Sequence, residues 1–191
     1  MKSWQSKEVQ ARHAIEEHGF VAQDANVLFR ANCPNIDLVV FGKSAATYVQ
    51  VKSSQKPSGP DTVIVDGSTW SEDQLRNGGP IFNKHDGCFR ASLIVIVATT
   101  KTGETEFYIA PPAELEKLLI PRARTFADLP KRDGKQRSIA FRKELPREVL
   151  KPWLNAWQQL GESITDGPET PLIIRSARFV PKPDSYRPAT T

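Results

Sequence analysis

Hydrophobic and polar residues follow two periods along this chain, one typical of helices and one typical of strands. Apolar residues recur at helical spacing over 4–18, and Gly19 is suited to the left-handed residue that ends a helix. Segments 20–23, 36–41 and 47–53 are rich in β-branched and aromatic residues, and the turn-like sequence GKSA separates the last two. The N-terminal part is therefore predicted to form a helix, a short strand and a β-hairpin.

The same patterns predict further strands and helices after the hairpin. A polar loop begins after residue 53, and prolines, glycines and a basic segment divide the elements beyond it. In chain order, these elements are expected to be a short strand at 62–65, a helix at 71–76, strands at 91–99 and 105–110, a helix at 111–119 stopped by Pro121, a basic loop at 122–137, a strand at 138–142 and an amphipathic helix at 146–160 closed by Gly161.

This order predicts an α/β fold, in which a central mixed β-sheet is flanked by helices and extended by a C-terminal strand and helix. We expect a single domain over 1–163, with a core at about 3–110 and a basic elaboration at 111–163. Five prolines after Ser163 predict an extended tail over 164–191.

Composition narrows the class of protein. With 39% hydrophobic residues the 191-residue chain can bury a core, and its longest wholly apolar run, 93–98, is far too short to span a membrane. The N-terminal sequence has no apolar stretch typical of a signal peptide, and Cys33 and Cys88 form no CxxC motif. We expect a cytoplasmic protein without a membrane partner, a disulfide framework, a structural zinc or a nucleotide cofactor.

Positive charge is concentrated towards the C-terminus. The net charge is +4, yet residues 122–151 hold ten Lys or Arg against four Asp or Glu. Such a segment either contacts a nucleic-acid backbone or forms a solvated face, and the sequence leaves both open. Ser53 and Ser54, which follow the second hairpin strand, either contact phosphate or simply end the strand, and the sequence leaves both open. The candidate nucleic-acid contacts are Lys43, Ser53, Ser54, Lys131, Arg132, Lys135 and Arg137.

Three polar residues interrupt the two apolar strands of the hairpin. The period of two in a strand puts Gln50 and Lys52 on one face, and a turn centred on Lys43 and Ser44 puts Asp37 directly across from Gln50. Buried polar groups cost on the order of a few kcal/mol unless they are paired. Carboxylate and amide oxygens suit Mg²⁺, and an ammonium group beside them can hold a water or stabilise a charged transition state.

At these residues the chain resembles the PD-(D/E)XK nucleases. Their signature is an Asp on one hairpin strand and Glu-x-Lys, in some members Gln-x-Lys, on the next. Here residues 35–38 (NIDL) match the first half, with Asn35 in place of the first motif residue, and residues 50–52 (QVK) match the second. Gln50 brings no charge, so a metal would be held with less negative charge than in an Asp and Glu site. The resemblance implies an αβββαβ core and covers about 3–110.

The first helix extends the resemblance to the Holliday-junction resolvases of that superfamily. These carry a metal-site Glu near the start of a helix that ends in Gly-Phe, and here Glu8 precedes Gly19 in the same arrangement. Glu16 and Glu17 are rivals, but they lie near the helix C-terminus, where the dipole disfavours a carboxylate. The dipole alone also favours a Glu at the position of Glu8, so a structural role stays open.

The resemblance implies an endonuclease that hydrolyses DNA with Mg²⁺, for which Mn²⁺ can substitute. Asp37, the Gln50 side-chain oxygen and the Val51 carbonyl would bind the metal, Glu8 would orient a water or help to hold a second metal, and Lys52 would position the attacking water. We expect a homodimer, because two sites cut a duplex most simply. The alternatives are a nucleic-acid-binding module that has lost hydrolysis, and, among enzymes, a structure-specific resolvase rather than a sequence-specific one.

Overall fold

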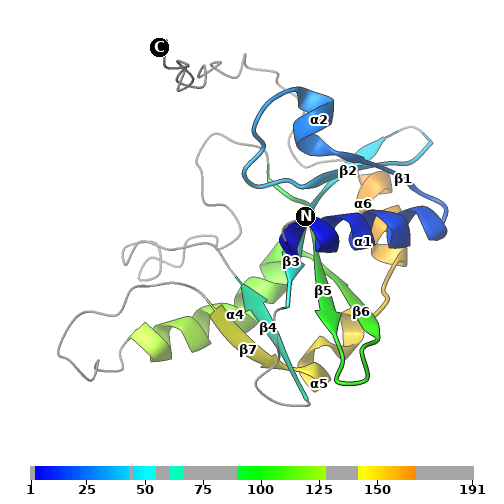
Figure 1. The fold of residues 1–191 in the computed structure, drawn as a ribbon. Helices are drawn as coiled ribbons and strands as arrows, with labels where there is room; N and C mark the ends of the chain where they lie inside the picture. The colour runs from blue at the N-terminus through cyan, green and yellow to red at the C-terminus, as the bar shows by residue number, and fades with distance from the viewer. Residues whose placement is uncertain (1–2, 44, 55–60, 67–89, 128–141, 167–191) are drawn as a thin grey trace, which may run out of the picture.

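The computed structural model describes residues 3–43, 45–54, 61–66, 90–127 and 142–166, which form two β-sheets covered by helices (Figure 1). This confirms the predicted α/β class. In chain order, the elements are α1 (Ser3–Glu17), β1 (Val21–Asp24), α2 (Ala25–Phe29), β2 (Leu38–Phe41), β3 (Ala46–Ser53), β4 (Thr62–Asp66), β5 (Leu93–Thr99), β6 (Thr105–Ala110), α4 (Pro112–Ala127), β7 (Arg142–Pro146), α5 (Arg147–Leu150), the 3₁₀ helix η1 (Lys151–Trp153) and α6 (Gln158–Asp166).

The larger sheet, as the described residues form it, has the strand order β1-β2-β3-β5-β6. Its neighbours are antiparallel except β3 and β5, which run parallel, so the sheet is mixed as predicted. β5 is buried from Leu93 to Ala98. A strand covered on both faces should be apolar throughout, and the sequence LIVIVAT meets that requirement.

Helix α1 ends as its sequence predicts. Gly19 has a positive φ of 85°, which costs glycine little because it lacks a Cβ. The Phe20 amide donates to the Ile15 carbonyl and the Gly19 amide to the Glu16 carbonyl, at 3.3 and 3.0 Å. These two bonds form a Schellman motif, which turns the chain directly into β1.

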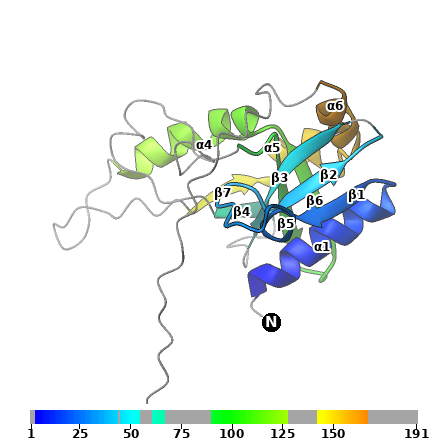
Figure 2. The same ribbon diagram turned by 90° about the horizontal axis from the view of Figure 1, so that it is seen from above.

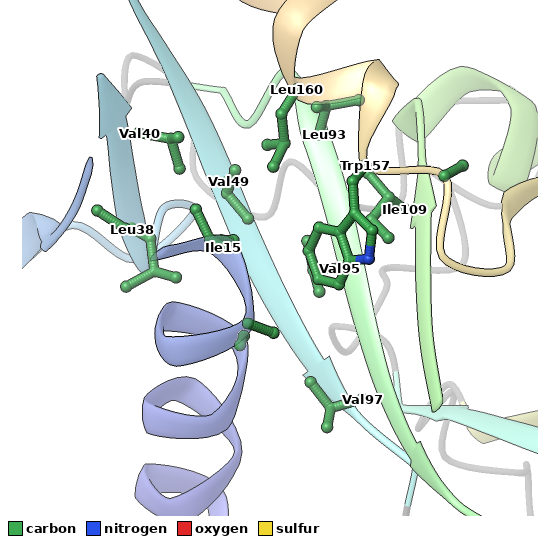
Figure 3. Packing of buried hydrophobic residues seen from close by; sticks show 14 of the residues in the cluster. Ile15, Leu38, Val40, Val49, Leu93, Val95, Val97, Ile109, Trp157 and Leu160 are labelled. Carbon is green, nitrogen blue, oxygen red and sulfur yellow. The ribbon is translucent and has the colours of Figure 1, made fainter. Parts of the chain in front are cut away.

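One face of the larger sheet packs against α1 and α6 (Figure 3). The contact is apolar, and Trp157 closes it by stacking on His18, with 4.4 Å between the ring centroids. Trp157 is thus a core residue. The buried residues of this face are Ala11, Ala14, Ile15, Ala22, Leu38, Val40, Val49, Leu93, Val95, Val97, Ile109, Ala156, Trp157, Leu160 and Ile164.

The other face of the sheet packs against α4, α5 and the antiparallel pair β4–β7. Ile94, Ile96 and Tyr108 lie on this side, together with Leu115 and Leu119 of α4. In the view from above, α1 and α4 lie on opposite sides of the larger sheet (Figure 2). The strand predicted at 62–65 is confirmed as β4. Of the strand predicted at 138–142, residues 138–141 lie outside the described residues, and Arg142 begins β7.

Helix α4 does not stop before Pro121, as the sequence had predicted, but continues to Ala127. Proline removes one backbone donor from a helix interior without ending the helix by itself. Arg122 Nη1 donates to the Leu118 carbonyl at 2.9 Å, and Thr125 Oγ1 donates to the Pro121 carbonyl at 3.0 Å. These side-chain bonds support the turns around the proline, and residues 122–127 are helical rather than part of a basic loop.

The single helix predicted over 146–160 is wrong. The chain forms α5 and η1, leaves helical geometry, and starts α6 afterwards. Pro152 lies in η1, and Asn155 adopts a positive φ of 52°. Between them, Leu154 bridges to Tyr108 of β6, so pairing with the sheet competes with the helix. Helix α6 then runs through Gly161 to Asp166, past the residue where the tail was predicted to begin.

Other predicted features lie outside the described residues. They are the helix at 71–76, Cys88, residues 128–141 of the basic segment and the tail from 167 onward. Residues 128–141 include the candidate DNA contacts Lys131, Arg132, Lys135 and Arg137. Within the described part of the chain, no helix is both long and apolar enough to cross a membrane.

The packing of α6 on the β2–β3 turn predicts opposite effects for two glycine substitutions. A methyl group at Gly42 would lie 2.6 Å from Ile164 Cγ2, so Gly42→Ala should destabilise the protein by about 1–3 kcal/mol. Gly161 lies inside α6, and a methyl group added there would lie 4.0 Å from Phe20 Cζ, which is ordinary van der Waals contact. Gly161→Ala should therefore stabilise it by about 0.5–1 kcal/mol. Urea denaturation measures both changes.

The Gly42 effect is tested further by pairing it with Ile164→Ala. Removing the obstructing side chain should make the double variant less destabilised than the two single effects predict together. Strict additivity would contradict the packing described for this turn.

Candidate functional site

β3 extends beyond its pairing with β2. The ladder between these strands joins Phe41 to Ala46 and ends with Leu38 opposite Val49, which is the register predicted from the sequence. β3 continues to Ser53 alongside β5. Asp37 therefore lies at the end of β2, facing a part of β3 that has β5 on one side and no longer has β2 on the other.

Three hydrogen bonds hold Asp37 at this point. Its amide donates to the Val49 carbonyl at 2.9 Å, and its carbonyl accepts from the Ala25 amide at 2.9 Å. Its carboxylate Oδ2 accepts from the Val51 amide at 2.6 Å. Asp37 thus contacts the residues on either side of Gln50, which refines the predicted position directly across from Gln50.

Gln50 has a buried oxygen without a partner. The residue is 4% exposed, and no donor among the described residues reaches its Oε1. Gln50 pairs with Ile94 in the parallel ladder, so its side chain lies on the face opposite α1. An unsatisfied buried acceptor typically costs about 1–3 kcal/mol, so this oxygen calls for a partner, which can be a water or a bound ion.

Lys52 lies on the same face as Gln50, since it pairs with Ile96 two residues along the ladder. Its charge acts on Asp37. Burial raises the pKa of the Asp37 carboxyl, the hydrogen bond from Val51 and the charge of Lys52 oppose this rise, and Asp24 adds to it. The site therefore combines one largely desolvated carboxylate with a nearby ammonium group.

Glu8 lies on α1, and the charge of Asp37 acts on it. Burial, followed by the charges of Asp37 and then Asp24, raises the pKa of Glu8 to about 7. The rivals Glu16 and Glu17 are exposed at the other end of α1, where Glu16 makes an ion pair with Arg12. Of the three glutamates considered from the sequence, Glu8 is the one whose charge interacts with Asp37.

The donor atoms at this point fit a hard cation such as Mg²⁺. They are the unpartnered Gln50 Oε1, the Asp37 carboxylate and the Val51 carbonyl, which points to the same side of β3 as the Val51 amide. No three His, Cys, Asp or Glu side chains gather as a metal-binding group in the described residues. The fit therefore depends on an amide and a peptide oxygen as well as on carboxylates.

The candidate nucleic-acid contacts near the hairpin are spread out. Lys43 is exposed in the β2–β3 turn, at the opposite end of β2 from Asp37. Ser53 ends β3 and pairs with Val97. Ser54 is buried, and its Oγ accepts from the Ile64 amide at 2.9 Å. The Ser54 hydroxyl therefore joins the end of β3 to β4, which is a structural role.

Asp24 was not singled out from the sequence. It ends β1, and its Oδ1 accepts from the Val27 amide at 3.1 Å as the N-cap of α2, a helix that was not predicted. Its charge raises the pKa of both Glu8 and Asp37. The sequence feature that could have predicted α2 is an Asp, a favoured N-cap residue, directly before the short and largely apolar segment ANVLF.

Comparisons with known proteins yield structural neighbours only. No protein-family model matches the chain, and no curated protein sequence matches it. The fold is similar to that of a bacterial homing endonuclease, I-Ssp6803I, with a TM-score of 0.44 and 20% identity over 87% of this chain and 96% of the other. It is similar to MepB with a TM-score of 0.24 and 11% identity over 76% of this chain and 80% of the other.

The raised pKa of Glu8 predicts a pH-dependent stability. With a pKa of about 7 in the folded state against 4.5 as the ordinary value, the folded protein holds a proton between these pH values that the unfolded chain has lost. Stability should therefore fall as the pH rises through this window. Glu8→Gln removes the contribution, so the melting temperature of the variant relative to wild type should be higher at pH 8 than at pH 5.

The matched control is Glu17→Gln, which neutralises an exposed carboxylate on the same helix. Its melting temperature relative to wild type should change little between the two pH values. Equal behaviour of the Glu8 and Glu17 variants would contradict the proximity of Glu8 to Asp37.

Proposed function

We propose that this protein is a metal-dependent endonuclease that hydrolyses DNA phosphodiester bonds. The observation that carries the proposal is the buried Gln50 oxygen, which lacks a partner among the described residues and belongs to the residue next to Val51, the donor to the Asp37 carboxylate. Lys52 follows on the same face of the same strand. This combination of hard oxygen ligands and an ammonium group suits phosphoryl transfer, and it supports the resemblance to the Gln-x-Lys nucleases.

Asp37, Gln50 Oε1 and the Val51 carbonyl would hold Mg²⁺ or Mn²⁺, with Glu8 completing the charge. When bound, the ion would neutralise charge on the phosphate and make a water easier to deprotonate. Without a bound cation, the negative charges of Glu8 and Asp37 repel each other, and this repulsion makes the ionised carboxylates less favourable. That repulsion favours cation binding, and it offsets the absence of a charge on Gln50.

The remaining chemistry falls to the side chains. Lys52 would donate a hydrogen bond to the attacking water or to a phosphate oxygen and stabilise the charge that develops there. Glu8 would orient the attacking water by accepting a hydrogen bond from it. In-line attack forms the new bond from the water oxygen to phosphorus and breaks the bond to the 3′ oxygen. The attacking water gives up a proton to solvent, and the leaving 3′ oxygen takes one from solvent to become a 3′-hydroxyl.

The substrate-binding surface extends this proposal. Lys43, Ser53, Lys131, Arg132, Lys135 and Arg137 are the candidate contacts to the DNA backbone. A homodimer would supply the two sites needed to cut both strands. The resemblance of α1 to the resolvases favours a structured DNA junction over a specific sequence.

Gln50 is expected to trade stability for metal binding. Gln50→Met removes the unpartnered oxygen at similar volume, so the metal-free protein should gain about 1 kcal/mol of unfolding free energy. The same variant should lose the stabilisation that millimolar Mg²⁺ gives the wild type. Urea denaturation in EDTA and in Mg²⁺ measures both effects.

Asp37→Ala should also lose the Mg²⁺ response, and Gln23→Met, which changes an exposed glutamine on β1, should keep it. A Gln50→Met protein that Mg²⁺ still stabilises as it does the wild type would remove Gln50 from the metal site.

Lys52 is expected to act in cleavage more than in binding. Lys52→Ala should lower the rate of plasmid nicking in Mg²⁺ or Mn²⁺ at least about a hundredfold, as loss of a transition-state donor does elsewhere. Its affinity for DNA, measured in EDTA by gel shift, should stay near that of the wild type.

Lys101→Ala, which removes an exposed lysine from the β5–β6 turn, serves as the control and should cleave normally. Wild-type protein that binds DNA but cleaves with neither metal would favour the alternative, a binding module that has lost hydrolysis. Cleavage at an undiminished rate by the Lys52 variant would exclude Lys52 from the reaction.

A further inference from the structure

We propose that Asp24 is a positioning residue, which holds Asp37 in place through the short helix α2. The inference rests on the nuclease function proposed above and extends it to a residue that touches neither substrate nor metal in that scheme. The observation behind it is a pair of hydrogen bonds, one from the Val27 amide to the Asp24 side chain and one from the Ala25 amide to the Asp37 carbonyl, which the first turn of α2 connects.

The first step is the cap. Asp24 Oδ1 accepts from the Val27 amide at 3.1 Å, and Asp24 has the extended backbone of an N-cap residue, with φ −61° and ψ 125°. Helix α2 has five residues. A helix this short is not stable on its own, so its geometry depends on its ends. The cap therefore fixes the direction of the first amide of α2.

The second step is the contact of α2 with the site. That first amide belongs to Ala25, which is fully buried and donates to the Asp37 carbonyl at 2.9 Å. Asp37 in turn donates its amide to Val49 and accepts from Val51 through its carboxylate. Asp37 lies beyond the last β2–β3 ladder pair, Leu38 with Val49, and its bond to Ala25 continues the register that pairs Asp24 with Leu38. Ala25 therefore links the first turn of α2 directly to the Asp37 peptide.

The third step separates the cap from the charge. Asp24 is paired with Leu38 across β1 and β2, and it adds negative charge near Glu8 and Asp37. A carboxylate held for its charge alone would need no hydrogen bond to α2. Asn can replace Asp as an N-cap with almost equal strength, whereas Ala cannot. Asp24→Asn therefore keeps the positioning and removes the charge, and Asp24→Ala removes both.

The experiment compares Asp24→Ala, Asp24→Asn and wild type, with Val27→Ala as a control that shortens a side chain 75% exposed on the same helix. Amide hydrogen exchange followed by NMR reports on the Ala25 and Val51 amides. Asp24→Ala should speed exchange at both by about tenfold, the order expected for loss of a cap. Asp24→Asn and Val27→Ala should leave both within about twofold of wild type.

Cleavage kinetics provide the second readout. Asp24→Ala should lower kcat about tenfold and leave KM for DNA within about twofold, because a misplaced Asp37 affects the reacting atoms more than the bound backbone. Asp24→Asn should restore kcat. Equal losses in the Ala and Asn variants, or unchanged exchange at Ala25 in the Ala variant, would overturn the proposal. Wild-type protein that cleaves no DNA would refute the nuclease function, and the exchange rates alone would then decide the role of Asp24.

Discussion

The hydrogen bond from the Val51 amide to the Asp37 carboxylate is the interaction on which the candidate site depends. It forms where the β2–β3 ladder ends. Beyond that point the Val51 amide donates to a side-chain oxygen of Asp37 instead of to a backbone carbonyl of β2. The carboxylate is thereby drawn alongside Gln50, whose oxygen has no partner in the described residues. Asp37 is largely desolvated, and Glu8 is within electrostatic reach of it. The cation proposed for this site would offset these electrostatic costs, and local costs of this kind are typical of functional positions in a packed interior.

Much of the frame of the site could be predicted from the sequence, because local rules determine it. The turn at residues 42–45 sets the hairpin register, and the Gly42 amide donates to the Ala45 carbonyl at 2.9 Å. The period of two then assigns Gln50 and Lys52 to one face. Gly19 ends α1 for a steric reason that no tertiary contact needs to supply. The pairing of β3 with β5, in contrast, joins segments about forty residues apart and was not specified by any local pattern.

The failures of prediction have two physical origins, namely local side-chain hydrogen bonds that a hydrophobic period does not reveal and tertiary contacts that outweigh local preference. Pro121 lies inside α4, where the Arg122 and Thr125 side chains bond to carbonyls one turn earlier. The expected helix at 146–160 divides because Leu154 pairs with Tyr108 on β6. Helix α2 is too short to produce a periodic pattern, and its stability comes from the Asp24 cap and from burial of Ala25. The electrostatic role of Asp24 followed from that missed helix and could not be inferred without it.

The shortness of β2 has a consequence for how such a chain can vary. The turn fixes the register at one end of the hairpin, and the site is at the other. Inserting or deleting one residue in the turn would leave every site side chain in the sequence, yet it would move Asp37 out of reach of the Val51 amide and exchange the faces of one strand. Loop length at 42–45 should therefore be constrained in relatives of this protein as tightly as the site residues are, even though the loop is at the opposite end of the hairpin from the site. Length variation should instead accumulate at the β5–β6 turn, where no comparable register is transmitted to the site.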